Sequence, residues 1–453
     1  MQPSALLTDY YQLTMAYAYW QRGMHQQEAV FHMFFRRNPV QGDYVIAAGL
    51  RRVIDFLQNF QFTDADIEFL AQQKTPVFSN EFLKFLKTVR FTGDIDAVPE
   101  GSVVFANEPL LRIKAPIFLC QLLETPLINF INFSSAVTSM ASRMRVIAED
   151  DRLLEFGLRR AQGPDGGMTA SYASFLGGFD ATSNVLAAQQ FGIPVTGTMT
   201  HSWIMAFDDE LTAFSEYARL MPENVVLLVD TYDTLTGIDH AITVGKQIQA
   251  KNIPLRAVRL DSGELSVLSR AARQKLDDAD FFDTKVIVSG DLTEERMLDL
   301  KSVNAPIDGW GVGTHLSTSY EQPALDMVYK LGAIQNNREW NYKLKLSDNN
   351  LKTSDPGILQ VRRYYEGKRW LRDVIYHLHL NSLPITPEEN TQDLLQPIFK
   401  SGTLVYQQPS LLESREFCMN EVAQFQLSKS IQYVVERDLA LRSLKKNLME
   451  KQR

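Results

Sequence analysis

Four apolar runs in the second half of this 453-residue chain end in the same way. Each run breaks off into small and polar residues, and three of the breaks carry an aspartate, at Asp230, Asp261 and Asp291, while the fourth ends at Thr314. The three aspartates are 31 and 30 residues apart. That period suits a strand, a loop, a helix and a second loop that leads back to the next strand. The pattern therefore predicts successive βα units of a parallel barrel.

Two further strands are predicted upstream, at 152–157 and 193–201, with a helix beginning near Met168 between them. Six units are therefore visible instead of the usual eight, which indicates an irregular barrel. We place this barrel at 134–345. The predicted fold class is α/β: an irregular TIM-like α/β barrel with an N-terminal α/β sandwich domain, to which the C-terminal segment returns.

The patterns outside the barrel are mixed, and they divide into an N-terminal domain (1–133) and a C-terminal segment (346–453). Helical periodicity, strand alternation and Gly/Pro punctuation mark the expected elements. These are a helix at 8–23, strands at 29–36 and 43–49, a helix from Leu50, short β segments at 91–116, two helices leading to the barrel, a β-hairpin at 361–380 and helices at 411–449.

Composition limits the classes of partner. The net charge of −8 argues against general nucleic-acid binding, which needs a basic face. Arginine pairs such as Arg159-Arg160 are local and suit a small anionic ligand better. Two cysteines, Cys120 and Cys418, imply no disulfide framework, and a reducing cytoplasm is the simplest compartment.

Membrane targeting is not expected. The N-terminus lacks a basic region and reaches Asp9 before any apolar core, so it does not have the pattern of a signal peptide. The most apolar window, 116–133, contains Gln121, Glu124, Pro126 and two asparagines. These interruptions favour a buried helix over a membrane span.

Barrel enzymes hold their chemistry at the carboxyl ends of the strands, where two glycine-containing segments occur. The segment GWGVGTH includes Gly311, Gly313 and Thr314, and SGD comprises Ser289, Gly290 and Asp291. Glycine lets backbone N–H groups approach phosphate oxygens, so both segments are candidate phosphate sites. The alternative is that the glycines only form tight turns.

Charged side chains occur at two other predicted strand ends. Arg259 and Asp261 are two residues apart and share a face, where an arginine suits a carboxylate and an aspartate suits ribose hydroxyls. An internal salt bridge is an equally good explanation. Phe156, Arg159 and Arg160 precede a Gly/Pro loop and suit an anionic or flat aromatic ligand, or else form a solvated surface pair.

His201 lies just past the predicted strand 193–201, together with Thr198 and Ser202. Most single histidines are structural, but this one falls where the chemistry is expected. The other six histidines have no metal-ligand spacing, so no zinc site is predicted.

The segment 225–237 superficially matches the diphosphoribose loop of type I phosphoribosyltransferases. That loop has adjacent acidic residues, whereas Asp230 and Asp233 are separated here, and only Gly237 follows. The type I architecture also lacks a serial barrel. We therefore reject it as the fold.

Six motifs in order closely resemble the nicotinate phosphoribosyltransferase family, from about residue 6 to 332. They are LLTDYYQLTMAYAYW (6–20), EFGLRRAQGPDGG (155–167), GGFDATSNVLA (177–187), GTMTHSW (197–203), VRLDSGEL (258–265) and GWGVGT (309–314). The resemblance implies the type II phosphoribosyltransferase fold, assembled as a homodimer with active sites near the subunit interface. It also implies formation of nicotinate mononucleotide and diphosphate from nicotinate and 5-phosphoribosyl 1-diphosphate, in NAD salvage.

The resemblance further implies that ATP hydrolysis is coupled through a phosphohistidine, which matches His201. The family's nicotinate contacts match Tyr11, Thr198 and Arg259, and its phosphoribose contact matches Thr314. We prefer Tyr11 to Tyr10 because Tyr10 joins the apolar face of the predicted helix. The remaining matches at ligand-lining positions are Arg159, Asp261, Gly290 and Asp291, with Asp261 expected to be catalytic. Mg²⁺ is the expected cofactor, and Asp230, Asp261 and Asp291 are its candidate ligands.

Three alternatives stay open at this point. A nicotinamide-specific sister enzyme would share the barrel. A quinolinate-using relative shares the fold, but it is normally shorter and does not use ATP. A catalytically silent, nucleotide-binding barrel would belong to a different functional class.

Overall fold

The β-strands of the described residues form one parallel sheet and three antiparallel or mixed sheets, distributed over two compact units. The computed structural model describes residues 4–39, 42–75, 78–346, 353–380, 383, 390–428 and 433–452. One unit comprises Met1–Ala136 and Ala324–Arg453, and the other comprises Val137–Pro323. Helix α5 (Ile117–Ala148) contributes residues to both.

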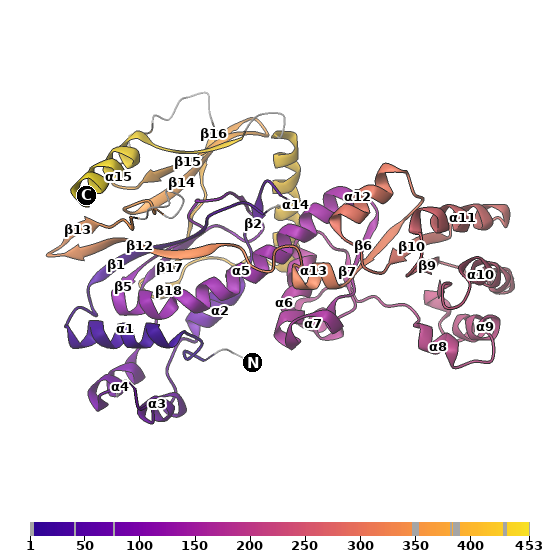
Figure 1. The fold of residues 1–453 in the computed structure, drawn as a ribbon, viewed down its shortest axis with the longest axis horizontal. Coiled ribbons are helices and arrows are strands. Elements are labelled where there is room, and N and C mark those ends of the chain that lie inside the picture. Colours follow the sequence, from indigo (N-terminus) through magenta and orange to yellow (C-terminus); the bar gives the residue numbers. More distant parts are fainter. Residues whose placement is uncertain are drawn as a thin grey trace. The chain divides into compact units, whose positions relative to one another are not determined.

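The unit formed by the two ends of the chain is built on a seven-stranded sheet of order β13-β12-β1-β5-β3-β17-β18. Figure 1 shows α1, α3 and α4 on one side of this sheet, and the sheet containing β14, β15 and β16 with α15 on the other. The elements before α5 are α1 (Tyr10–Gln21), β1 (Glu28–Phe35), β2 (Val45–Ile46), α2 (Leu50–Gln58), α3 (Asp64–Ala71), α4 (Asn80–Thr88), β3 (Asp94–Ala97), β4 (Val103–Val104) and β5 (Leu111–Pro116).

The C-terminal part of this unit completes the seven-stranded sheet and adds a four-stranded one, β16-β14-β15-β19. Its elements are β12 (Met327–Asn336), β13 (Glu339–Tyr342), β14 (Leu359–Glu366), β15 (Arg369–His377), β16 (Asn390–Asp393), β17 (Gln396–Lys400), β18 (Thr403–Leu404), α14 (Leu411–Ser428), β19 (Val434–Arg437) and α15 (Leu439–Gln452). The predicted hairpin at 361–380 is the antiparallel pair β14 and β15.

The second unit is built on the parallel sheet, of order β7-β6-β11-β10-β9-β8. Strands β8, β9, β10 and β11 are neighbours in chain order, as the 30-residue period predicts. The elements are β6 (Arg152–Glu155), η1 (Leu158–Arg160), α6 (Gly163–Leu176), β7 (Ala181–Thr182), α7 (Val185–Phe191), α8 (His201–Met205), α9 (Glu210–Leu220), η2 (Pro222–Asn224), β8 (Val226–Leu228), α10 (Thr234–Gln249), β9 (Ala257–Leu260), α11 (Leu265–Asp278), β10 (Lys285–Ser289), α12 (Glu294–Ser302), β11 (Gly309–Val312) and α13 (Thr314–Thr318).

The expected strand at 193–201 is wrong. This segment contains Pro194 and Gly197, and its one β contact is an isolated bridge between Val195 and Thr182. The strand that lies beside β6 is the two-residue β7, which is too short to produce an alternating pattern. The barrel boundary at 345 also differs from the structure, because β12 pairs with β1 in the unit formed by the chain ends.

The two helices expected after residue 116 are one continuous helix, α5. Pro126 lies inside it and removes the N–H that would bond the carbonyl of Leu122. The hydroxyl of Thr8 donates to that carbonyl at 3.0 Å, which compensates for the lost bond. By length and composition α5 is apolar enough to cross a membrane, but 61% of its most apolar window is buried inside the protein, as in the core helix of a globular fold.

The tail at 411–449 is also less regular than expected. Helices α14 and α15 are separated by β19, which pairs in parallel with β15. Helix α6 begins at Gly163, earlier than the predicted start near Met168, and Pro164 lies in its first turn, where the missing N–H costs nothing.

Candidate active site

The parallel sheet brings several of the predicted residues to one edge. Strands β9, β10, β11 and β6 are consecutive neighbours, so their carboxyl ends lie beside one another. Ser289, at the end of β10, is in register with Gly311 of β11. Arg259 lies near the end of β9, with Asp261 directly after it. These residues therefore meet where barrel enzymes keep their chemistry.

Arg259 connects Thr198 to Asp261. Its guanidinium donates to the Thr198 hydroxyl, and it pairs with the Asp261 carboxylate at 3.3 Å. The side chain of Arg259 is only 14% exposed, and its Nε is buried without a hydrogen-bond partner among the described groups. The internal salt bridge weighed from the sequence is thus present. The unused donor leaves capacity for a further acceptor.

Asp261 receives contacts from three of the other residues. The Ser289 hydroxyl donates to its carboxylate at 2.5 Å, and His201 Nε2 lies 3.8 Å from its other oxygen. Burial raises the pKa of Asp261, but the bond from Ser289 and the charges of Arg259 and His201 outweigh burial and lower it. Asp261 is therefore an anion at neutral pH.

His201 begins the short helix α8, whose N-cap is Thr200. Its Nδ1 lies 3.0 Å from the hydroxyl of Thr231, in the loop that follows β8. Its Nε2 faces Asp261, and 41% of the side chain is exposed. The ring is thus oriented from one nitrogen, and the other nitrogen stays accessible.

Asp230 organises the loop after β9. One carboxylate oxygen accepts from the backbone N–H of Asp261 at 3.1 Å and from the hydroxyl of Ser262 at 2.5 Å. The other oxygen is buried without a hydrogen-bond partner in the described part of the chain. Asp291 is exposed, with a φ of 47°. Among the described residues, no three His, Cys, Asp or Glu side chains are arranged to hold a metal ion.

The glycines have packing roles that the sequence did not reveal. A Cβ on Gly290, which has a φ of 87°, would lie 2.0 Å from the carbonyl oxygen of Asp261. A Cβ on Gly311 would lie 2.7 Å from the ring of Phe156. Gly313 is less crowded and directly precedes Thr314, the first residue of α13. Close packing alone thus accounts for Gly290 and Gly311, and their expected phosphate role stays a prediction.

Arg159 and Arg160 form the exposed end of η1. In the part of the chain that the structure describes, neither side chain forms an ion pair. Tyr11 belongs to the unit formed by the chain ends. It lies on α1 with half of its surface exposed, and its hydroxyl accepts from Gln12 Nε2 at 3.1 Å. Burial and then the charge of Glu124 raise the pKa of Tyr11.

The sequence patterns did not indicate two further residues at this edge of the sheet. Thr231 follows Asp230 and contacts His201. Glu155, the last residue of β6, is buried at the centre of a hydrogen-bond network. Its signal was a glutamate after the two leucines of the segment RLLE, a pattern that also occurs at many exposed strand ends.

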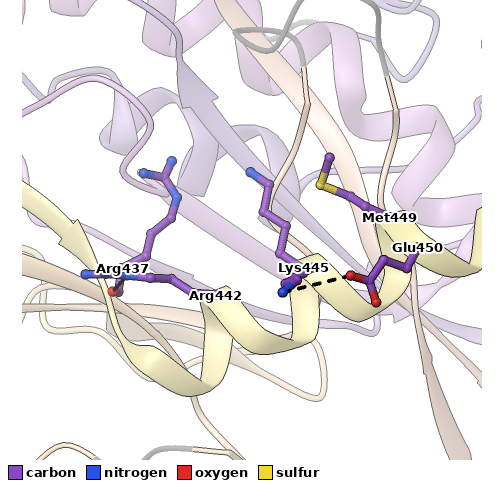
Figure 2. Close-up of a pocket in the computed structure, with 6 residues that line it drawn as sticks. Arg437, Arg442, Lys445, Met449 and Glu450 are labelled. Carbon is purple, nitrogen blue, oxygen red and sulfur yellow. Dashed lines mark hydrogen bonds and ion pairs between the residues drawn. The ribbon is translucent and has the colours of Figure 1, made fainter.

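A separate cavity of about 390 Å³ lies along α15. Figure 2 shows its lining, which includes Arg437, Arg442 and Lys445. Two of these cations already pair with Asp355, Arg437 through Nε and Lys445 through Nζ, both at 2.7 Å. None of the predicted site residues lines this cavity.

Comparison with known families matches most of the chain. Residues 6–132 match the nicotinate phosphoribosyltransferase N-terminal domain, and residues 152–367 match the nicotinate phosphoribosyltransferase family. The two matched ranges contain all the predicted site residues.

Individual relatives extend the similarity over nearly the full length. Nicotinate phosphoribosyltransferase of Bacillus subtilis is 38% identical over 92% of this chain and 89% of its own length. The Mycobacterium tuberculosis protein nicotinate phosphoribosyltransferase pncB2 is 42% identical over 92% of this chain and 87% of its own. The crystal structure of human nicotinic acid phosphoribosyltransferase superposes with a TM-score of 0.80 at 30% identity, covering 98% of this chain and 99% of the human one.

Proposed function

The chain belongs to the nicotinate phosphoribosyltransferase family, and we propose that it joins nicotinate to 5-phosphoribosyl 1-diphosphate, giving nicotinate mononucleotide and diphosphate in NAD salvage. The observation that carries the proposal is the cluster of Thr198, Arg259 and Asp261 at the strand ends, within a chain that matches the family along most of its length.

Nicotinate is a flat ring with a carboxylate, and Arg259 is the proposed anchor for that group. The partly buried guanidinium has an unused donor, and the Thr198 hydroxyl lies against it. Charge-assisted hydrogen bonds of this kind contribute about 1.5–3 kcal/mol each. Tyr11 is the proposed third contact, carried over from the family motif.

In the proposed reaction the bond from C1 of the ribose to the diphosphate oxygen breaks, and a bond from the pyridine nitrogen to C1 forms. C1 gains oxocarbenium character, as in glycoside chemistry. Asp261 is an anion at neutral pH and is suited to accept from ribose hydroxyls. Arg159 and the Gly313-Thr314 segment are the proposed contacts for phosphate oxygens. Most of the catalysis is then positioning and electrostatic stabilisation.

Mg²⁺ is the proposed cofactor, and when bound it neutralises diphosphate charge. Asp230 fits this role because one of its oxygens is buried without a hydrogen-bond partner among the described groups, and Asp261 fits because it is ionised. Because no three-residue metal cluster exists in the described part, most Mg²⁺ ligands are expected to be substrate oxygens and water, which this ion commonly retains.

We also propose that ATP is a co-substrate and that His201 is transiently phosphorylated. The ring is fixed through Nδ1 by Thr231, and Nε2 stays accessible beside Asp261. A phosphate on this nitrogen adds charge and acceptors next to the loops that follow the strands. Ordering of those loops would favour substrate binding until the phosphate is lost.

A homodimer with active sites near the subunit interface, and a cytoplasmic location, complete the proposal. Both cysteines, Cys120 and Cys418, are free and buried, as suits a reducing compartment.

The direct test of the activity is product formation from nicotinate and 5-phosphoribosyl 1-diphosphate, with and without ATP. The same assay with nicotinamide in place of nicotinate tests the alternative that the chain is a nicotinamide-specific enzyme. Absence of diphosphate release with all substrates present would favour the silent nucleotide-binding barrel.

A further inference from the structure

Glu155 is a buried carboxylate at the carboxyl end of β6. It is 1% exposed, and its strand lies between β11 and β7 in the parallel sheet. Burial of a carboxylate is strongly unfavourable unless hydrogen bonds or an opposite charge compensate for it. An acidic side chain in this position therefore has a structural or functional role.

Three neutral donors satisfy this carboxylate. They are the backbone N–H of Gly157, the hydroxyl of Ser171 at 2.9 Å and the hydroxyl of Thr182 at 2.5 Å. Across the described ranges, no lysine, arginine or histidine forms an ion pair with it. The donors come from the loop after β6, from α6 and from β7, so one carboxylate ties three elements together.

The bond to Gly157 fixes the start of η1, the turn that carries Arg159 and Arg160. Gly157 is also packed tightly, because a Cβ on it would lie 2.4 Å from Cβ of Ser317 in α13. Helix α13 begins at Thr314. The carboxylate thus holds the arginine-bearing turn against the helix that follows the GVGT segment.

The same network holds the neighbouring loop after β7. The hydroxyl of Thr182 accepts from the backbone N–H of Asn184 at 3.0 Å, and the Asn184 amide donates to Ser171 at 3.1 Å. Asn184 is the N-cap of α7. Buried polar groups therefore fix two adjacent loops at the candidate site.

We infer that Glu155 is a positioning residue whose carboxylate, through the backbone of Gly157, fixes the turn that presents Arg159 to the anionic phosphoribosyl donor. This inference rests on the proposed function and on the proposed role of Arg159. An exposed arginine loses conformational freedom when it binds an anion, and a fixed backbone reduces that cost. Glu155 touches no substrate in this scheme and acts only through the turn.

A double-mutant cycle tests the inference. Steady-state kinetics are measured for wild type, Glu155→Gln, Arg159→Ala and the double variant, at saturating ATP. Each single change is expected to raise KM for 5-phosphoribosyl 1-diphosphate roughly tenfold or more, as for loss of a charge-assisted contact. KM for nicotinate should stay within about twofold. The double variant should be no worse than Arg159→Ala, because both changes remove one interaction.

Asp180→Asn is the matched control. Asp180 also accepts a backbone bond, from Leu153 at 2.9 Å, and it pairs with Arg145, near the opposite ends of β6 and β7. This variant should lower Tm without changing the KM ratio of the two substrates. If Glu155→Gln does not fold, Ser171→Ala provides the test in its place. This variant removes only one of the three donors, so it should give a smaller rise in KM for 5-phosphoribosyl 1-diphosphate.

Additive effects in the cycle, or a normal KM for the phosphoribosyl donor in folded Glu155→Gln and Ser171→Ala, would overturn the inference. The activity of the wild type distinguishes failure of this inference from failure of the proposed function. Product from wild type with an unaffected KM in the variants refutes only the role of Glu155, whereas no product from wild type refutes the proposed function.

Discussion

Asp261 shows how single residues gain a role from their neighbours. Ser289, Arg259 and His201 all contact its carboxylate, and together they lower its pKa despite burial. The same side chain therefore stabilises Arg259 and presents a negative charge toward His201. The sequence left two explanations open for Arg259 and Asp261, an internal salt bridge and ligand contacts. These explanations do not exclude each other, because an ion pair formed in this way can stabilise the fold and also contact a ligand.

Replacement of Arg259 by alanine tests the proposed nicotinate anchor. Loss of charge-assisted hydrogen bonds is expected to raise KM for nicotinate roughly 10- to 100-fold, corresponding to about 1.5–3 kcal/mol. Arg259→Lys keeps the charge without the planar fork and should give an intermediate value. Initial-rate kinetics with varied nicotinate provide the measurement, and an unchanged KM would remove Arg259 from this role.

Replacement of His201 by alanine separates ribosyl transfer from ATP coupling. The variant is expected to keep slow ribosyl transfer and to lose the stimulation by ATP, because the proposed phosphate acceptor is gone. Product and ADP are quantified in parallel. Continued ATP hydrolysis in proportion to product would show that His201 is not the phosphorylated group. Thr231→Val, which removes only the contact to Nδ1, should retain part of the coupling.

At the scale of elements, the candidate site depends on how closely the strand-end loops approach one another. Gly290 lies against the backbone of Asp261, and Gly311 lies under the ring of Phe156. The sequence predicted both glycines at strand ends, in candidate phosphate sites or in tight turns. Their neighbours could not be predicted, since the contacts are made by loops from different βα units.

Gly290→Ala is expected to lower both stability and activity. The new Cβ would meet the carbonyl oxygen of Asp261 at 2.0 Å and displace the residue on which the cluster is centred. Gly192→Ala is the matched control, because Gly192 also has a positive φ, 69°, but has no neighbouring atom within 4 Å of its Cβ position. The control should cost only about 1 kcal/mol of stability and leave kcat unchanged. Thermal unfolding and kinetics of both variants decide the point, and equal behaviour would contradict the packing argument.

The elements also show where sequence patterns stop being informative. The apolar runs at β8 to β11 predicted the parallel strands because the runs end alike and the first three recur about every 30 residues. Strand β7 has two residues and no period. Helix α5 continues through Pro126 because Thr8, more than a hundred residues earlier, bonds the free carbonyl of Leu122. A contact of that sequence separation leaves no local signal.

At the scale of the whole molecule, the unit formed by the chain ends buries two histidines in their neutral form. His32 is 2% exposed, and its Nε2 accepts from the backbone N–H of Leu359 at 3.2 Å. Burial lowers the pKa of His32 to about 3 and that of His377 to about 4. Both values lie below the ordinary 6.5, so the unfolded chain binds these protons first as the pH falls.

This unit is therefore expected to lose stability between about pH 6.5 and pH 4, at about 1.4 kcal/mol per pH unit for each histidine. Above pH 6.5 both histidines are neutral in either state, and their stabilising contribution is complete. Urea unfolding at pH 4.5, 5.5, 6.5 and 7.5 measures the slope, which His32→Gln should reduce. His379→Gln should reduce it less than His32→Gln does, because His379 is exposed and contributes only through the effect of its charge on the pKa of His377. Equal slopes for wild type and His32→Gln would contradict the account.

The family and its α/β fold followed from the sequence because six motifs occur in the family's order, and the comparisons confirm both. The pairing of Arg259 with Asp261 was also accessible, since residues two apart share a strand face. The role of Glu155 could not be predicted from the sequence, because it depends on donors from three different parts of the fold. The role of Tyr11 stays a prediction from the motif.

The central claim is that this chain makes nicotinate mononucleotide. The most direct measurement incubates the purified protein with Mg²⁺, 5-phosphoribosyl 1-diphosphate and either nicotinate or nicotinamide, with and without ATP, and quantifies both mononucleotides by chromatography. We predict nicotinate mononucleotide with equimolar diphosphate, faster with ATP, and little product from nicotinamide. Preferential use of nicotinamide, or no diphosphate release from either base, would contradict it.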